Sequence, residues 1–158
     1  MAMTPEILLK AYVRYQSEDA FRELVAGTLD EVYSASLRIV DGTPRLASEI
    51  AVRVYLELAR KAPRLGKDVV LNSWLRERTC KMAVSVLRAE DRAVDWAVLK
   101  KEKEDPSIRA DPAPPGLAIR IYYNVFPYTG RRKGFGLFWP TAWWPAWVRP
   151  RHLRVAAV

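Results

Sequence analysis

The residues best suited to chemistry lie in one helical stretch, residues 73 to 92. At about 100° per residue, four cations fall on one side of such a helix: Arg78, Lys81, Arg88 and Arg92. Trp74 precedes them on the same side. Cations bind phosphates, and an exposed aromatic ring can stack on an unpaired base. The pattern therefore suits a nucleic-acid strand, although a solvated face of an ordinary core helix, with Trp74 packed on a neighbouring helix, gives the same spacing.

Groups suited to catalysis or metal binding are scarce. The only histidine, His152, has no cysteine or histidine near it in the sequence. The single cysteine, Cys80, lies next to the apolar side of the helical stretch, as a buried thiol would. Glu49 and Glu57 lack a partnering base, and no glycine-rich phosphate loop occurs. We therefore expect neither enzymatic activity nor a metal or other cofactor.

Positive charge is concentrated toward the C-terminus. Of the 26 Lys and Arg residues, 18 lie in residues 1–105 together with 17 acids, whereas residues 106–158 hold 8 cations and a single acid, Asp111. A net charge of +8 favours a polyanionic partner, such as nucleic acid or an acidic membrane surface.

Sequence features of a secreted or membrane-spanning protein are not apparent. Glu6 and Lys10 interrupt any apolar signal segment near the N-terminus. No run approaches the roughly 18 to 20 apolar residues that span a bilayer. A single cysteine excludes an internal disulfide and fits a reducing compartment. The expected localisation is the cytoplasm.

The basic helix belongs to a predicted all-α fold, a compact bundle of three long helices and a shorter first one. Thr4-Pro5-Glu6 is typical of a helix start, and Ser17 opens a second helical run that stops at Asp41-Gly42. A third run follows Pro44 and ends before Pro63. A loop over residues 63–71 then leads into the basic helix, for which Ser73 is the expected N-cap.

Beyond residue 95 the helical pattern weakens. Residues 100–105 are charged, and the proline-rich residues 111–116 exclude regular structure. Residues 118–126 alternate apolar and polar, which predicts a strand, and residues 129–134 could turn the chain back to form a β-hairpin.

We divide the chain into a helical domain (1–95), a charged then Pro-rich linker (96–116) and a basic, Trp-rich tail (117–158). The tail holds Trp143, Trp144 and Trp147 among basic residues. Such a segment could contact an anionic membrane surface, or its tryptophans could cover apolar surface of the bundle.

Several short motifs follow one another through the helical domain: AFRELV (20–25), Val32-Tyr33, Leu37-Arg38, Asp41-Gly42, Leu46-Ala47, Glu49, Val54-Tyr55-Leu56, LARKAPRL (58–65), Trp74-Leu75 and Leu87-Arg88. In this order and spacing they resemble region two of bacterial RNA polymerase sigma factors of the extracytoplasmic-function type. The resemblance covers roughly residues 4 to 93 and is carried by the whole series.

This resemblance implies a transcription-initiation module. Its docking helix, residues 46–61, would bind the clamp of the β′ subunit of core RNA polymerase, and its last helix would hold the melted non-template strand of the promoter −10 element. The loop 63–72 would help to form a pocket for an extruded base. Promoter DNA, core polymerase and an anti-sigma protein are the expected partners. The implied DNA-binding residues are Arg64, Lys67, Asn72, Trp74, Arg78, Lys81, Arg88 and Arg92, and the implied polymerase-binding residues are Glu49, Val52, Arg53 and Leu56.

The chain also departs from the pattern of that family. The docking helix keeps Glu49, but it carries Ser48, Val52 and Arg53 where the family usually has an acid, a glutamine and another acid. Cys80-Lys81 replaces a frequent Arg-Asn or Arg-Phe pair, and residues 106–158 show no helix-turn-helix pattern. These differences favour an alternative, a sigma-like interaction or regulatory protein without promoter activity.

Overall fold

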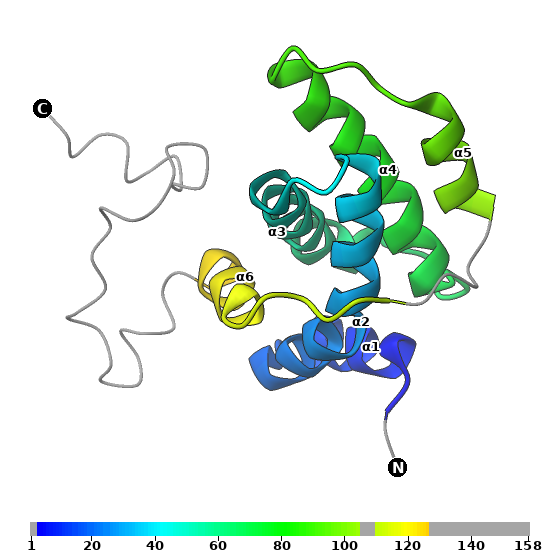
Figure 1. Ribbon diagram of the computed structural model, residues 1–158. Helices are drawn as coiled ribbons and strands as arrows, with labels where there is room; N and C mark the ends of the chain where they lie inside the picture. The colour runs from blue at the N-terminus through cyan, green and yellow to red at the C-terminus, as the bar shows by residue number, and fades with distance from the viewer. Residues whose placement is uncertain (1–2, 105–109, 127–158) are drawn as a thin grey trace, which may run out of the picture. The chain divides into compact units, whose positions relative to one another are not determined.

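The structure is a computed structural model that describes residues 3–104 and 110–126 (Figure 1). Every regular element in these ranges is helical. The elements are α1 (Pro5–Tyr15), α2 (Glu18–Ile39), α3 (Pro44–Lys61), the 3-10 turn η1 (Ala62–Arg64), α4 (Leu71–Ala89), α5 (Trp96–Glu104) and α6 (Leu117–Val125). The expected all-α fold is thus confirmed for the described part of the chain.

Local sequence sets both ends of α2 and the start of α3. Ser17 caps α2, since its Oγ accepts a hydrogen bond from the Ala20 amide at 3.2 Å. Asp41 and Gly42 end α2 in the left-handed region, with φ of 52° and 72°, and the Gly42 amide donates to the Leu37 carbonyl at 2.8 Å. Pro44 then occupies the first turn of α3, where a missing amide hydrogen costs nothing.

The core lies where α2, α3 and α4 meet and is extended by α1. Its large side chains include Phe21, Leu24, Ile50 and Leu58, all without solvent exposure. Each such burial contributes roughly 1.5–3 kcal/mol. Tyr55 is also fully buried, and its hydroxyl lies 2.7 Å from the Thr28 hydroxyl, which satisfies its polar end. These contacts fix the two helices that flank α4.

The start of α4 differs from the expectation. The helix begins at Leu71 after Val70, so Ser73 lies inside the first turn and the prediction that it caps the helix is wrong. The Leu71 amide instead donates to Oε1 of Glu6 on α1, at 3.4 Å. A carboxylate there also suits the positive end of the helix dipole. A side chain 65 residues away in sequence replaces the local cap, which no local pattern could predict.

Helix α5 extends the helical unit beyond residue 95, where we placed its boundary. Asp95 caps α5 because its Oδ1 accepts from the amides of Ala97 and Val98, at 3.0 and 3.2 Å. Glu102 is buried and forms a bidentate ion pair with Arg38 of α2, in which Nη2 donates a hydrogen bond to Oε2 at 2.9 Å. The described residues up to Val125 form one compact unit that includes α5 and α6.

The strand predicted over residues 118–126 is wrong, because Leu117–Val125 form α6. Leu117, Ile121 and Asn124 are buried, at the helical spacing of four and three residues, and α6 packs on α3 and α2 (Figure 1). A short apolar run fits either period, and packing decides between them. The predicted turn over 129–134 and the Trp-rich segment lie outside the described residues.

The preceding segment, 111–116, contains neither helix nor strand, as predicted. It lies against α2, where the Asp111 amide donates to the Ser34 hydroxyl at 2.6 Å and the Ala113 amide donates to Oδ1 of Asp30 at 2.8 Å. None of the described helices combines the length and apolar character needed to cross a membrane.

Candidate nucleic-acid interface

The first half of α4 carries a cation that is already engaged. Nη1 of Arg78 lies 3.3 Å from Oε1 of Glu57 on α3, and its guanidinium lies 5.6 Å from the centre of the Trp74 ring. Lys61 reaches the same Glu57 oxygen at 2.5 Å. Trp74 is itself half-buried. Arg78 therefore joins α4 to α3, and Trp74 offers less of its ring than the sequence led us to expect.

The second half of α4 is more open. Lys81 and Arg88 are exposed. Lys81 forms a 2.6 Å ion pair with Glu77, one turn earlier, and this contact lowers the pKa of the Glu77 carboxyl. Both side chains of the pair are more than half exposed, so it contributes little to stability. Arg88 forms no ion pair with any described residue, whereas Arg92 donates from Nη1 to the Thr43 hydroxyl at 3.1 Å and is thereby held at the start of α3.

The loop residues expected to bind DNA are exposed but do not converge. Arg64 ends η1, and Lys67 lies on an apolar depression of about 360 Å³ between the loop and α1. Asn72 lies at the start of α4 and lines a different pocket. The loop 63–72 therefore does not enclose a single site with these three side chains.

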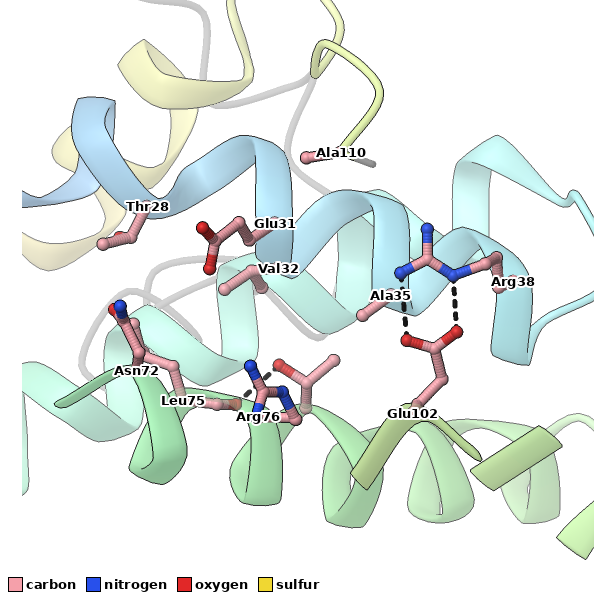
Figure 2. A pocket seen from close by; sticks show the side chains of 11 residues that line it. Thr28, Glu31, Val32, Ala35, Arg38, Asn72, Leu75, Arg76, Glu102 and Ala110 are labelled. Carbon is pink, nitrogen blue, oxygen red and sulfur yellow. Dashed lines mark hydrogen bonds and ion pairs between the residues drawn. The ribbon is translucent and has the colours of Figure 1, made fainter. Parts of the chain in front are cut away.

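The pocket that contains Asn72 lies between α2 and α4 and measures about 120 Å³ (Figure 2). Glu31 reaches into it from α2, and Asn72 and Arg76 line it from α4. Among the described residues, none bonds to these three side chains. The Arg38–Glu102 pair lies at one end, and Val32, Ala35 and Leu75 add apolar surface. An acceptor, a guanidinium and an amide around this volume suit a small planar polar group.

The candidate polymerase-binding row on α3 is largely engaged within the fold. Val52 is fully buried and cannot reach a partner while α3 keeps this packing. Glu49 is 5% exposed, and its Oε1 forms an ion pair with Nη2 of Arg53 at 2.6 Å. Nη1 of Arg45 lies 4.0 Å from the other carboxylate oxygen. Leu56 is partly exposed. Only Arg53 and Leu56 of the four therefore present surface.

Helix α6 adds a further cation near that row. Burial lowers the pKa of Arg120 on α6, while the negative charge of Glu49 raises it. Since α6 packs on α3, the surroundings of Glu49 include a third positive side chain, Arg120, besides Arg53 and Arg45. Arg53, which stands where the family usually has an acid, is thus paired with Glu49 within the chain.

The structure contains a basic groove between α4 and α5 that the sequence analysis did not predict. This α4–α5 groove has a volume of about 450 Å³. It is lined by Cys80, Lys81, Val84, Arg88, Trp96, Leu99, Lys100 and Lys103. We assigned residues 96–116 to a linker, although Trp96, Lys100 and Lys103 recur at spacings of four and three, which is the signal of one helical face. The groove joins two of the predicted DNA-binding residues, Lys81 and Arg88, to three that were not predicted.

Cys80 lies at the floor of this groove and is 1% exposed. Burial raises the pKa of its thiol, so the thiol stays protonated at neutral pH. A protonated, inaccessible thiol is a poor nucleophile. Cys80 therefore contributes packing to the groove rather than reactivity.

Comparisons of this chain with protein-family models, with curated proteins and with solved structures gave no match.

Proposed function

We propose that this protein is a sigma-factor-like transcription-initiation module that binds core RNA polymerase and the single-stranded −10 region of a promoter. The motif series that resembles sigma region two lies on α2, α3 and α4, which pack on one another in a single helical unit. The observation that carries the proposal is the exposed basic surface along the second half of α4, formed by Lys81 and Arg88. Polyanionic strands bind such surfaces through their phosphates.

In this proposal the chain binds and positions its partners and performs no chemistry. The exposed loop cations Arg64 and Lys67 and the α4 cations would hold phosphates. The pocket lined by Glu31, Asn72 and Arg76 could take a planar polar group, such as the edge of an unpaired base. Arg53 and Leu56 would present the polymerase-facing side of α3.

The direct test is a pull-down of purified core polymerase by the full-length chain, followed by binding of a single-stranded oligonucleotide to the retained complex. The proposal expects retention of polymerase above background and stronger oligonucleotide binding by the complex than by polymerase alone. Absence of any polymerase retention would overturn the polymerase half of the proposal, and oligonucleotide binding by the complex that is no stronger than binding by polymerase alone would overturn the other half.

A second function is favoured by the state of α3. Glu49 is paired with Arg53, Val52 is buried, and α6 packs on the same helix. A chain that had kept the bundle while losing polymerase docking would act as a sigma-like interaction or regulatory protein. In the same pull-down, this candidate predicts no retention of polymerase.

A further inference from the structure

The α4–α5 groove collects positive charge from two helices. Lys81 and Arg88 lie two turns apart on α4, which is about 10 Å along the axis. Lys100 and Lys103 line the same groove from α5, which packs along α4 (Figure 1). Two rows of cations facing one groove can hold successive negative charges of an extended ligand.

These charges are poorly neutralised within the described part of the chain. Arg88, Lys100 and Lys103 form no ion pair there, and Lys81 has only its exposed pair with Glu77. The one acid of α5 that is buried, Glu102, is engaged by Arg38 of α2. Because exposed pairs are weak and screened by salt, an incoming anion can replace Glu77 at Lys81. The groove therefore offers four cations to an anionic ligand.

An exposed aromatic ring beside these cations narrows the class of anionic ligand that fits the groove. Trp96 begins α5, lines the groove and is 62% exposed, whereas the Trp74 ring is half-buried beside Arg78. Val84 and Leu99 supply an apolar floor. A large exposed indole beside cations suits a ligand that alternates phosphates with flat bases. An acidic peptide would use the cations but would leave the ring without a role.

We infer that the α4–α5 groove binds one strand of nucleic acid, with its phosphates on Lys81, Arg88, Lys100 and Lys103 and a base stacked on Trp96. The inference rests on the proposed single-strand binding and moves its aromatic platform from Trp74 to α5. It also makes α5 part of the binding domain rather than a linker.

The test measures the anisotropy of a labelled, mixed-sequence single-stranded oligonucleotide with the full-length chain over a range of salt. The groove variant carries Arg88→Glu and Lys100→Glu. A control variant, Lys10→Glu with Arg60→Glu, changes the net charge equally at exposed positions of α1 and α3. A third variant, Arg64→Glu with Lys67→Glu, probes the loop. Circular dichroism checks that each variant is folded.

We expect the groove variant to lose at least tenfold in affinity at low salt, and more than either other variant. Its slope of log K against log salt should decrease by about 1.4, since each lost phosphate contact on a single strand contributes about 0.7. Trp96→Ala should lower the affinity about 5- to 160-fold, whereas Trp96→Phe should retain most of it, since a smaller ring still stacks.

Other outcomes overturn the inference. Equal losses in the groove and control variants would mean a general charge effect. A loss confined to the loop variant would contradict the groove while the proposed strand binding stood. No binding by the native chain would overturn both. Polyglutamate that displaced the oligonucleotide as effectively as unlabelled strand would identify an acidic peptide as the ligand instead.

Discussion

Helices α3 and α4 both carry rows of charged side chains, but the rows differ in what they contact. On α3, Glu49 is buried and paired with Arg53, and α6 packs on the helix. On the second half of α4, Arg88 meets solvent and faces more cations from α5. Paired, buried charge therefore belongs to the packing of the fold, whereas exposed and unpaired charge of one sign is left for a partner.

The largest effect should come from loosening α6 from α3. Ile121 has no solvent exposure, so Ile121→Ala should lower the free energy of unfolding by about 2–4 kcal/mol, through lost burial and the cavity left behind. Urea denaturation measures this. Ile119→Ala is the matched control. Because Ile119 is 55% exposed, this substitution should lower the free energy of unfolding by less than about 0.5 kcal/mol. Equal costs at the two positions would contradict the packing of α6 described here.

The next largest effect concerns the ion pair that joins α5 to α2. Glu102→Gln removes the buried partner of Arg38 and should cost about 1–3 kcal/mol, less than a fully buried pair because Arg38 keeps some solvent contact. The same variant should weaken oligonucleotide binding, since α5 supplies one wall of the α4–α5 groove. Lys101→Gln, at an exposed position of α5, is the control. Wild-type stability of Glu102→Gln would show that the pair does not hold α5.

Substitutions in the two halves of α4 should affect stability and oligonucleotide binding differently. Arg78→Ala removes a contact with Glu57 and Trp74 and should cost about 1 kcal/mol, while oligonucleotide affinity changes less than threefold. Arg88→Ala should cost under about 0.5 kcal/mol but lower affinity several-fold, because the side chain is exposed and unpaired within the described part. Denaturation and anisotropy on both variants measure the two effects. The reverse ranking in affinity would place the strand on the first half of α4.

The smallest effect is a dependence on alkaline pH. Burial raises the pKa of Cys80 above 9.0 and also raises the pKa of Tyr55. The unfolded chain loses these protons first, so the free energy of unfolding should fall as the pH rises above about 9. Cys80→Ala should flatten the first part of that fall. A thiol reagent at pH 8 should modify native Cys80 at least tenfold more slowly than the urea-unfolded chain, and equal rates would contradict its burial.

Much of the bundle could be predicted because its signals are local. Pro5, Ser17 and Pro44 mark helix starts, and the Asp41-Gly42 turn ends α2. The start of α4 could not be predicted this way, since Glu6 supplies a contact from a distant helix. In α6 the alternation and the helical spacing coexist, and only its packing on α3 selects the helix.

The candidate site was predictable in part for a similar reason. Periodicity identifies the side of α4 that carries cations, but it cannot tell that Glu57 occupies Arg78 while Arg88 stays open. The linker assigned to residues 96–116 concealed the helical spacing of Trp96 and Lys100. Charge patterns predict which residues share a face, whereas the tertiary fold decides which of them are neutralised.

Photo-cross-linking locates the bound strand on the protein. A single-stranded oligonucleotide containing 5-iodouracil would be irradiated with the full-length chain, and the modified peptide identified after trypsin digestion. Trypsin places the six tryptophans in three peptides: residues 68–76 contain Trp74, residues 93–100 contain Trp96, and residues 134–151 contain the other four. Strand binding in the α4–α5 groove predicts modification of 93–100, lost in Trp96→Ala. Modification of 68–76 or 134–151 with 93–100 untouched would contradict it.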